Sequence, residues 1–417
     1  MSYCDMIGSG YKNSQSKTDS ARVKGSLDSL SEHAAVPSDL ATFMNILYTN
    51  FHSAATLGGH SIYILSLLNE LATRHRLSVA VPAGCGLARM AAKLPGVKVF
   101  AQEYPGRYFK RVQAARQLRR LIREQQIDVI HVNGSADHRT VMQACLVMGS
   151  RRPRVVFTKH NDQRISPLGA TLRARLCTDH VIGVCNYVGA MLRASPYARL
   201  PISIIANGVS GEHFRPWPRE QAHAARQTLL GTHAADCRLL VGSNAGTNDY
   251  KGWMDMVEGL ALLKEQAHGV YVALAGAYPN AEQQQALKDM GWSDRVIFTG
   301  PLDDVRPFLA ALDMGFVLSY RVETISFACR EMMAMGLPVI VTDQGGLPEN
   351  ITPETDGWVV PRRHPQAVAD VMRRVLQDPD CLIPMGQAAR KKSDLEFSRE
   401  AFARRTEHVY LNAMQVD

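Results

Sequence analysis

The feature that most constrains the fold is an alternation of short apolar runs with helical patterns, which occurs twice along the chain. The first half alternates helical periodicity with the runs FMNILYTN, LSVAVP, VKVFA, IDVIHVN and RVVFTKH, and it ends with HVIGVCN and ISIIANG. The second half repeats the alternation with RLLVGSN, VYVALAG, RVIFTG, MGFVLS, LPVIVTD and WVVP. The helices predicted between these runs include one near residues 139–148 and one over residues 305–312. Short Val- and Ile-rich runs between helices are typical of parallel strands buried on both faces of a sheet. We therefore predict an α/β protein of two facing, doubly wound Rossmann-like domains, with a ligand cleft at the carboxyl ends of their strands.

Chain length supports the same division. A chain of 417 residues is too long for one ordinary hydrophobic core and fits two domains and a tail. Residues 1–42 are rich in Ser, Asp and Lys and show no sustained period, so we predict a disordered N-terminal tail. The predicted domains are residues 43–205 and 206–395. A final helix within residues 396–417 is expected to pack back on the first domain.

The expected location and redox state follow from patterns that the sequence lacks. It has no apolar run of about 18 residues, which a membrane-spanning helix needs, and its N-terminus lacks the apolar core of a secretory signal. We therefore expect a cytoplasmic protein. The eight cysteines form no C-x-x-C pair, a pattern that favours buried, reduced thiols over a zinc site or a disulfide framework.

Positive charge is concentrated in the first domain. Residues 43–205 carry 22 Lys and Arg against seven Asp and Glu, a net charge of +15, whereas residues 206–417 carry a net charge of −6. A positive field of this kind attracts nucleic acid, anionic lipid and phosphorylated substrates without distinguishing them. The charge alone therefore leaves the class of partner open.

One predicted helix, GRYFKRVQAARQLRRLIRE, carries much of this charge. Its apolar positions fall on one face at helical spacing: Tyr108, Val112, Ala115, Leu118 and Ile122. Two interpretations remain open, namely an ordinary amphipathic helix with a solvated face and a surface that meets anionic lipid or a phosphorylated glycolipid acceptor. The helix has no recognisable nucleic-acid-binding motif and no interleaved stacking aromatics, so we do not expect nucleic acid as a partner.

Two carboxylates mark the second domain. Glu323 follows the run GFVLS, and Glu331 lies eight residues later, in a helix that we predict to begin near residues 324–326. The free N–H groups and the positive dipole end of that helix would favour a phosphate in the cleft. Glu331 lies among Phe and Met residues, and a carboxylate there needs a hydrogen-bonding partner. A ribose diol is one such partner, and an ion pair with Arg330 or another surface base is the alternative.

Several short motifs occur in a fixed order. The second domain contains IANGVSGEHFRP, Lys251-Gly252 within NDYKGW, the spacing E-x(7)-E from Glu323 to Glu331, and GLPVIVTDQGGLPE. The first domain contains Gly58-Gly59-His60, DVIHVN and VVFTKHND. In this order the motifs resemble those of the retaining glycosyltransferases of glycosyltransferase family 4, over about residues 43–400. The resemblance implies the GT-B fold, in which a first, acceptor-binding domain faces a second, donor-binding domain.

The resemblance also implies roles for residues of the second domain. Glu331 would bind the ribose hydroxyls of a sugar-nucleotide donor, and Glu323 would hold the sugar near its transferring carbon. Lys251 would neutralise the diphosphate as it leaves, which is the main electrostatic demand of the reaction. The diphosphate would also be capped by three backbone N–H groups at the helix start, those of Thr324, Ile325 and Ser326.

In the first domain, the resemblance implies that His160 faces the sugar or the acceptor from the end of a strand, and it makes His160 and Glu323 the expected catalytic residues. Gly58 and Gly59 would form a glycine-rich loop of the donor site. The implied partners are a nucleotide-sugar donor and a glycan or lipid-linked acceptor. No bound metal is expected, consistent with the absence of a D-x-D motif in a plausible site.

Four positions depart from the family pattern. Ser243 stands where Arg is usual, Ser326 where Gly is common, Ser210 where Asp is usual and Asn133 where a second His is usual. Ser243 and the following Asn244 then line the donor site with one phosphate cation fewer. Either another base or neutral hydrogen-bond donors must therefore hold the phosphate.

The family implies transfer with retention of anomeric configuration. We expect a front-face displacement in which the leaving phosphate accepts the acceptor's proton. The expected activity serves bacterial lipopolysaccharide or surface polysaccharide synthesis, in the cytoplasm or peripherally on the inner face of the plasma membrane.

Three other classes of protein are weighed against this reading. An oxidoreductase would need a G-x-G-x-x-G after the first strand, which the sequence lacks, and a two-lobed solute-binding protein would need an export signal. Another GT-B enzyme, such as a sugar-nucleotide epimerase or a phosphorylase, is the nearest alternative, since fold alone does not separate these activities.

Overall fold

Two parallel β-sheets organise the protein, whose structure is a computed structural model that describes residues 43–321 and 323–415. The predicted tail at residues 1–42 lies outside the described residues. The first sheet has seven strands: β1 (Asn45–Thr49), β2 (Arg76–Val81), β3 (Val97–Ala101), β4 (Val129–Val132), β5 (Arg154–Lys159), β6 (His180–Gly183) and β7 (Ile202–Ile204). The second has six: β8 (Leu239–Ser243), β9 (Val270–Leu274), β10 (Val296–Phe298), β11 (Met314–Val317), β12 (Val339–Thr342) and β13 (Gly357–Val360).

The first six strands of each sheet follow the same order, and the first sheet adds a seventh strand at one edge. It runs β3-β2-β1-β4-β5-β6-β7 in the first and β10-β9-β8-β11-β12-β13 in the second. In the first sheet Ile46 pairs with Leu77 of β2 on one side and Val129 of β4 on the other, both in parallel. Each sheet therefore reverses direction beside its first strand, which is the switch point where open α/β sheets bind ligands. The prediction of two doubly wound sheets is confirmed.

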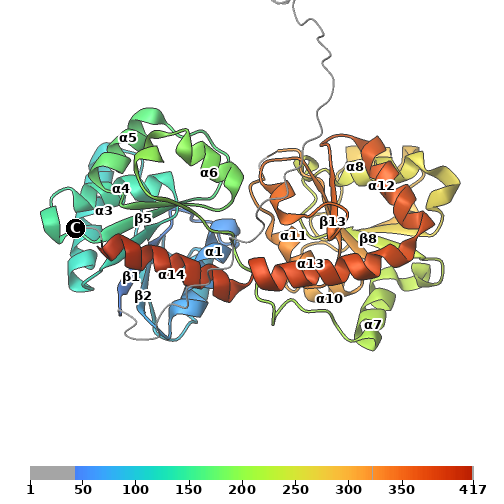
Figure 1. Ribbon diagram of the computed structural model, residues 1–417, viewed down its shortest axis with the longest axis horizontal. Coiled ribbons are helices and arrows are strands. Elements are labelled where there is room, and N and C mark those ends of the chain that lie inside the picture. Colours follow the sequence, from blue (N-terminus) through green and yellow to red (C-terminus); the bar gives the residue numbers. More distant parts are fainter. Residues whose placement is uncertain (1–42, 322, 416–417) are drawn as a thin grey trace, which may run out of the picture. The chain divides into compact units, whose positions relative to one another are not determined.

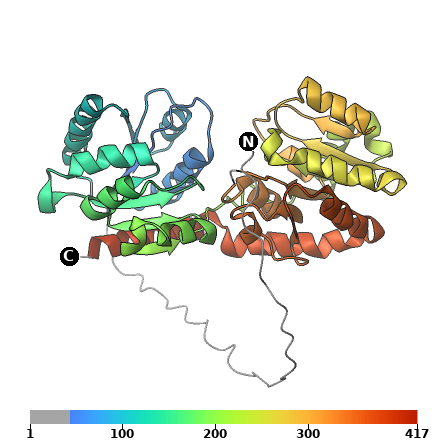
Figure 2. The ribbon, with the colours of Figure 1, turned by 90° about the horizontal axis from the view of Figure 1, so that it is seen from above.

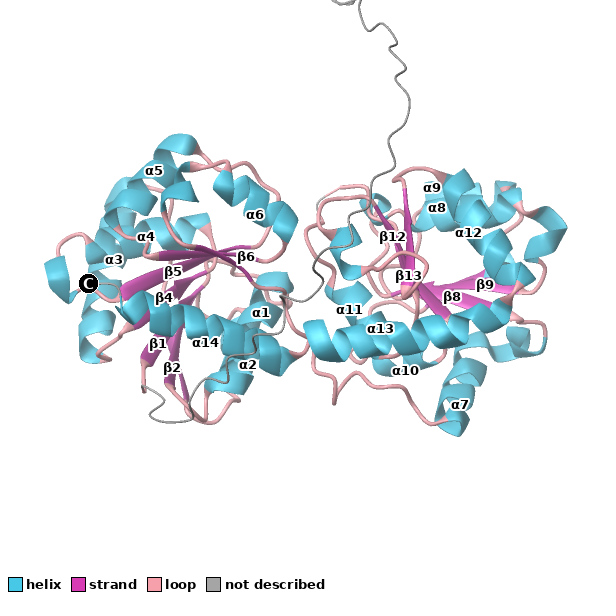
Figure 3. Ribbon diagram, viewed as in Figure 1, coloured by secondary structure: helices cyan, strands magenta, loops and turns pink. Residues whose placement is uncertain are grey.

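Helices lie on both faces of each sheet (Figure 3). In the first half they are α1 (Gly59–Leu71), α2 (Gly86–Ala91), α3 (Tyr108–Glu124), α4 (Ser135–Cys145), α5 (Pro167–Leu176) and α6 (Asn186–Arg193). In the second half they are α7 (Arg219–Leu230), α8 (Trp253–Leu262), α9 (Ala281–Asp289), α10 (Arg306–Ala310), α11 (Phe327–Ala334), α12 (Pro365–Gln377) and α13 (Leu382–Glu396), before α14 (Arg399–Gln415). Short 3-10 turns are η1 (Gly149–Arg151), η2 (Pro196–Arg199), η3 (Gly231–Ala235), η4 (Asp249–Lys251), η5 (Lys264–Ala267), η6 (Ser293–Arg295), η7 (Leu347–Asn350) and η8 (Pro379–Cys381).

The last helix belongs to the first sheet's core although it ends the chain. α14 lies alongside strands of the first sheet, whereas α13 packs with the second (Figures 1 and 2). Phe402 and Tyr410 are buried in the first hydrophobic core. Arg399 donates from its Nε to Glu70 at 2.6 Å, which ties the start of α14 to α1.

The chain passes between the halves at two adjacent segments. The backbone N–H of Val209 donates to the carbonyl of Phe397 at 2.8 Å, and the N–H of Arg399 donates back to Val209 at 3.1 Å. A Cβ at Gly208 would lie 2.6 Å from the carbonyl oxygen of Ser398. The glycine of the sequence ANGVSG therefore permits the close approach of the two crossing segments.

Two helix boundaries differ from the expectations. α4 begins at Ser135, four residues before the predicted start at residue 139, because Gly134 breaks from β4 in an extended conformation directly before it. α10 spans Arg306–Ala310 only, although the pattern predicted residues 305–312.

The apolar face of α3 is shorter than predicted. Ala115, Leu118 and Ile122 are buried, but the Tyr108 side chain is 60% exposed and Phe109 is 87% exposed. The Tyr108 ring lies 5.8 Å from the guanidinium carbon of Arg111 instead of in the core. The first turn of α3 therefore presents two aromatic rings among cations.

Candidate functional site

A glycine pair shapes the loop that carries Glu323. Gly345 and Gly346 follow β12, and a Cβ on either would collide with the carbonyl oxygen of Glu323 or Thr324. Gly345 also has a φ of +57°, a backbone conformation that glycine adopts without steric cost. The motif QGGLPE therefore brings the backbone of the loop at Glu323 against the end of β12.

Lys251 and Glu323 form an ion pair. The Nζ of Lys251 lies 2.8 Å from Oε2 of Glu323, and the Ser319 hydroxyl donates to the same oxygen at 3.0 Å. Glu323 is 8% exposed. Gly252 fixes the neighbouring backbone, because its φ is +68° and a Cβ there would collide with the carbonyl of Leu318. Two residues that the sequence assigned separately to sugar and diphosphate thus contact each other.

Glu331 contacts Asn244. The Nδ2 of Asn244, just after β8, donates to Oε2 of Glu331 at 2.7 Å, and burial raises the pKa of Glu331 to about 7. The alternative ion pair with Arg330 is wrong: that guanidinium donates to Asn350 at 2.8 Å and to the carbonyl of Asn207 at 2.5 Å. The buried Oδ1 of Asn244 has no hydrogen-bond partner among the described residues, so it is an acceptor available to a ligand.

The helix after Glu323 starts later than predicted. α11 begins at Phe327, and Ser326 is its N-cap, whose hydroxyl accepts from the N–H of Cys329 at 3.2 Å. A serine N-cap fixes the helix start one residue after itself, which the expectation of a start near residues 324–326 missed. The N–H groups of Thr324 and Ile325 therefore belong to the preceding loop.

Ser243 does not take the place of a phosphate-binding cation. It is buried, and its hydroxyl accepts from the N–H of Ala245 at 3.3 Å. A base that the sequence analysis did not single out lies nearby: the guanidinium carbon of Arg321 is 5.8 Å from the ring centre of Tyr250, and Lys251 Nζ is 5.4 Å from the same ring. In the sequence, Arg321 could have been identified as a candidate because it lies two residues before Glu323.

His160 is oriented by Asn133. Asn133 donates from Nδ2 to the carbonyls of Thr49 at 3.1 Å and His131 at 3.3 Å, so its Oδ1 faces His160 Nε2 at 2.9 Å. The Nε2 of His160 therefore carries the proton, and its Nδ1 remains an acceptor. The asparagine that departs from the family pattern thus sets the tautomer of the predicted catalytic histidine.

Three imidazole rings lie together at this end of the first sheet. The ring of His60 is 4.2 Å from that of His160 and 4.7 Å from that of His52, centre to centre. Burial, followed by the neighbouring His60, holds the pKa of His160 well below its usual value, so the ring is neutral at physiological pH. Gly58 precedes α1 as its N-cap and Gly59 begins it, and a Cβ at either would meet open space; their donor role stays a prediction.

Two contacts join these regions. The Thr324 hydroxyl donates to the carbonyl of His160 at 2.8 Å. Glu349, the acid of the GLPE motif, accepts from the N–H groups of Asn186 at 2.7 Å and Tyr187 at 2.8 Å, at the start of α6. A carboxylate is favourable at the positive end of a helix, so Glu349 has a structural role that the sequence analysis did not assign.

The described part of the chain contains neither a metal-binding cluster nor a helix that could span a membrane. Within residues 43–321 and 323–415, no three His, Cys, Asp or Glu side chains gather in a way that could hold a metal ion. The expectation of metal-free catalysis remains a prediction. In the same part of the chain, no helix combines the length and apolarity needed to cross a membrane.

Comparisons with known proteins agree with this architecture. Residues 57–213 match the family model described as Glycosyltransferase Family 4, and residues 238–378 match the one described as Glycosyl transferases group 1. The two matches cover most of both sheets. The fold and the acid- and lysine-bearing site therefore define a glycosyltransferase with the GT-B fold. The chain belongs to the glycosyltransferases of family 4, which confirms the predicted fold and enzyme class.

Two relatives and one solved structure illustrate the similarity. The GDP-mannose-dependent alpha-(1-6)-phosphatidylinositol monomannoside mannosyltransferase of Mycobacterium tuberculosis is 27% identical over 288 residues, 66% of this chain and 73% of the relative. The lipopolysaccharide core biosynthesis mannosyltransferase LpsB of Rhizobium meliloti is 27% identical over 270 residues, 63% of this chain and 73% of the relative. A glycosyltransferase crystal structure from Rickettsia africae has a TM-score of 0.78 at 17% identity and covers 90% of this chain and 100% of its own.

Proposed function

We propose that this protein is a retaining glycosyltransferase that moves a sugar from a nucleoside-diphosphate sugar to a glycan or lipid-linked acceptor. The observation that carries the proposal is the convergence of two carboxylates and a lysine at one sheet edge. Lys251 pairs with Glu323, and Glu331 pairs with Asn244, although the partners are 72 and 87 residues apart in sequence. These groups offer acceptors for hydroxyls and a cation for phosphate.

The donor is proposed to bind at this edge. Glu331 and the unpartnered Oδ1 of Asn244 accept from the ribose hydroxyls. Lys251 and Arg321, both beside the Tyr250 ring, face the diphosphate. In this arrangement Arg321 replaces the cation that Ser243 cannot supply. Glu323 holds the sugar, and its ion pair restrains the lysine before the diphosphate leaves.

The chemical step is proposed to be a front-face displacement without a bound metal. The glycosidic oxygen of the leaving phosphate accepts the proton of the acceptor hydroxyl as the new bond forms on the same face. Positive charge at Lys251 stabilises the phosphate charge that develops. His160, neutral and with Nδ1 free to accept a hydrogen bond, orients a hydroxyl of the sugar or the acceptor.

The biological setting is proposed from the relatives. One relative is named as a phosphatidylinositol monomannoside mannosyltransferase and another as a lipopolysaccharide core mannosyltransferase, so a lipid-linked surface glycan is the proposed acceptor and GDP-mannose is the first donor to test. The aromatic first turn of α3, with Tyr108 and Phe109 exposed beside Arg107 and Lys110, suits a peripheral contact with anionic lipid. Flotation with vesicles should then depend on anionic lipid and fall with salt.

The test of the proposal is donor binding followed by product analysis. A thermal-shift series with GDP-mannose, UDP-glucose, ADP-glucose and a CDP-sugar should raise the melting temperature with one base, because a ligand that binds only the folded state stabilises it. NMR of the early product should show the donor's anomeric configuration. Inversion at this stage would reject the front-face mechanism.

The remaining alternative is a GT-B enzyme that acts on the sugar nucleotide itself. Incubation with the donor and no acceptor separates the two activities. We expect slow release of nucleoside diphosphate by transfer to water and no change in sugar identity. Epimerisation of the donor under these conditions would replace the proposal with an epimerase.

A further inference from the structure

A polar cavity of about 240 Å³ lies in the first half of the chain and is lined in part by His160. Four cationic side chains line it: Arg139, Lys159, Arg164 and Arg173. No Asp or Glu is among its lining residues. We propose that this cavity binds an anionic group, a phosphate or a carboxylate, carried by the acceptor substrate. The inference rests on the proposed function, because it names the acceptor chemistry of that same site.

Arg173 is the most informative of the four cations. It lies on α5 and is 6% exposed, and within the described residues its side chain makes one hydrogen bond, from Nε to the hydroxyl of Tyr197 at 2.9 Å. A guanidinium carries five N–H donors, and burying it without an anionic partner costs free energy. Its terminal nitrogens lie beside Gly169, and both residues line the cavity, so an anion there would supply the missing partner.

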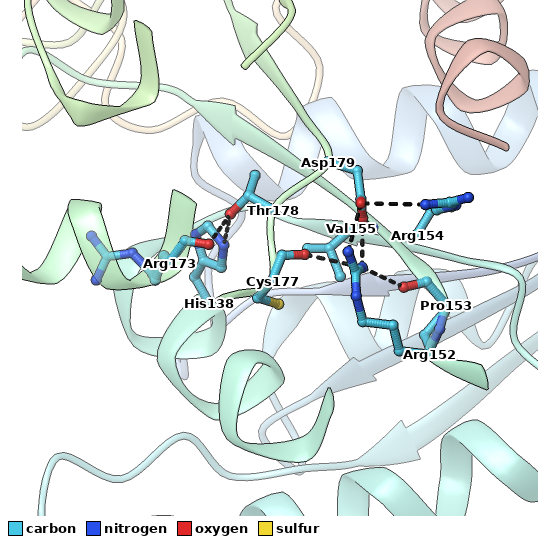
Figure 4. A network of polar contacts seen from close by, with 9 residues as sticks. All are labelled: His138, Arg152, Pro153, Arg154, Val155, Arg173, Cys177, Thr178 and Asp179. Atoms are coloured by element: carbon cyan, nitrogen blue, oxygen red, sulfur yellow. Dashed lines mark hydrogen bonds and ion pairs between the residues drawn. The ribbon is translucent and has the colours of Figure 1, made fainter. Parts of the chain in front are cut away.

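Neighbouring arginines show the contrast. Figure 4 shows Arg152 and Arg154 turned toward Asp179, with Arg152 Nη2 lying 2.7 Å from Asp179 Oδ1. In the same view the Arg173 side chain extends away from the network, and only its carbonyl oxygen takes part, accepting from the Thr178 hydroxyl at 2.9 Å. The first sheet thus pairs some of its cations internally, whereas no ion pair is recorded for Arg173 among the described residues.

A glycine makes room for this guanidinium. A Cβ at Gly169, one turn before Arg173 on α5, would lie 3.1 Å from its Nη1 and 3.7 Å from its Nη2. The first distance is shorter than an ordinary van der Waals contact. Glycine therefore lets the guanidinium lie along the helix toward the cavity, where a larger residue would displace it.

The other cations are held apart from acids as well. Lys159 donates to the carbonyl and side-chain oxygens of Asn161 at 2.5 and 2.6 Å, and burial lowers the pKa of its ammonium to about 8, with only Asp162 acting against the shift. Burial and the charges of Arg111 and Arg173 lower the pKa of Arg139, against a smaller opposing effect of Asp137. Asp137 is itself committed to Thr49 and the N–H of Asn133. Arg139 and Arg173 therefore repel each other, and a bound anion would relieve that repulsion.

The cavity adjoins the predicted catalytic histidine. His160 and Asn133 line the same cavity as the four cations, and the Thr324 hydroxyl donates to the carbonyl of His160 from the donor side. An acceptor anchored here by its charge would present a nearby hydroxyl to that imidazole. A cavity of this size has room for a phosphate or carboxylate on a sugar, and bidentate arginine contacts favour both groups.

The experiment compares charged and uncharged sugar probes on the purified full chain. Mannose 6-phosphate, glucuronate and methyl mannoside are titrated by ligand-observed NMR. We expect at least one anionic probe to bind about tenfold or more tightly than methyl mannoside, and Arg139→Gln and Arg173→Gln each to weaken that probe by about 10- to 100-fold. Arg175→Gln is the matched control, since it removes the same charge from the exposed face of α5 and should leave the affinity unchanged. The two anionic probes distinguish a phosphate from a carboxylate.

Three results would overturn the inference. The first is equal binding of neutral and anionic probes, and the second is an equal effect of Arg139→Gln and Arg175→Gln on the affinity. The third is binding of inorganic phosphate as tight as that of mannose 6-phosphate, because this result would identify a site for the free ion. If Arg173→Gln fails to fold, Arg139→Gln and Arg164→Gln carry the test, because both side chains are exposed. Binding of nucleoside diphosphate to the unmodified protein is measured in parallel. Its absence would reject the proposed glycosyl transfer, whereas its presence without probe discrimination rejects only the acceptor assignment.

Discussion

The two sheets share the order of their first six strands but end in opposite chemistry. Near the carboxyl ends of β8 and β11, the second half gathers Glu323, which pairs with Lys251, and Glu331, which pairs with Asn244. At the corresponding ends of β4 and β5, the first half gathers neutral imidazoles and a cavity lined by four cations with no acid. One topology thus supplies an acidic, hydroxyl-accepting edge and a basic, anion-accepting edge. The two proposals differ accordingly: the second half is proposed to bind the sugar nucleotide and the first half an anionic group of the acceptor.

The largest expected effect tests the acidic edge. Glu331→Ala removes the acceptor proposed for the ribose diol and leaves Asn244 Nδ2 without its partner. We expect kcat/KM for the donor to fall by about 10²- to 10³-fold, the loss typical of a polar group that a substrate hydroxyl needs. Steady-state kinetics with the best donor measure it. Glu265→Ala on exposed η5 is the control, and equal activity of the two variants would remove Glu331 from the donor site.

The second-largest expected effect distinguishes the contact of Lys251 with Glu323 from its proposed contact with the diphosphate. Lys251→Met breaks the pair with Glu323 and removes the cation proposed for the diphosphate. We expect nucleoside diphosphate to bind about 10- to 100-fold more weakly, while the affinity of the uncharged nucleoside changes little, because charge-assisted hydrogen bonds contribute about 1.5–3 kcal/mol. Calorimetry of both ligands measures the difference.

A control clarifies what the lysine does. Glu323→Gln also breaks the ion pair but keeps the cation. If both variants weaken the nucleoside and the nucleoside diphosphate equally, Lys251 acts by supporting the loop and not by contacting phosphate. The diphosphate would then need another cation at the acidic edge, and Arg321→Gln tests directly whether Arg321 supplies it.

The fold was predictable from the sequence to the extent that it depends on local patterns. Parallel strands buried on both faces read as continuous apolar runs, so all the strands of both sheets coincide with predicted runs. The start of α11 was predicted too early because the apolar pattern did not show that Ser326 is the N-cap and lies before the first helical residue. The exposed Tyr108 was missed because helical spacing does not show where the covering core ends.

The site was less predictable because its contacts join distant segments. Motif order placed Glu323, Glu331 and Lys251 near one edge, but the pairs Lys251–Glu323 and Glu331–Asn244 depend on how β8 and β11 lie side by side. The cationic cavity escaped notice for the same reason. Its four cations are spread over residues 139–173, and only the packing of α4 and α5 around β5 brings them together. Net charge of the first domain was the one sequence signal that pointed toward it.

A pH profile sharpens the comparison between the edges. Burial raises the pKa of Glu331 to about 7, so the carboxylate forms only as the pH rises through that value. With limiting donor, kcat/KM should rise about tenfold per pH unit below pH 7 and level off above it. The stability of the fold changes in the opposite direction. The folded state holds the Glu331 proton more tightly than the unfolded state, in which the pKa is 4.5. The contribution of Glu331 to the free energy of unfolding therefore falls as the pH rises from 4.5 to about 7.

The pH profiles of variants identify which of the two edges causes the pH dependence of kcat/KM. Burial raises the pKa of Asp137, behind the basic cavity, to about 7 as well. Glu331→Gln should remove the acidic limb of the activity profile, whereas Asp137→Asn should retain it. Persistence of the limb in Glu331→Gln would transfer the pH dependence to the first half and undo the assigned division between the edges.

The smallest effect concerns the support that the basic edge takes from the end of the chain. The Tyr410 hydroxyl of α14 lies 2.5 Å from Nδ1 of His131 and 3.3 Å from the hydroxyl of Tyr48, all fully buried. Tyr410→Phe leaves a buried ring nitrogen unpaired, which should lower the free energy of unfolding by about 1–3 kcal/mol in urea titrations. Tyr108→Phe on the exposed turn of α3 should change it by no more than about 0.5 kcal/mol. His131 lies two residues before Asn133, which orients His160. If Tyr410→Phe lowers only the stability, α14 supports the structure of the basic edge. If the variant lowers donor binding by as much, the structure of the basic edge also affects the acidic edge.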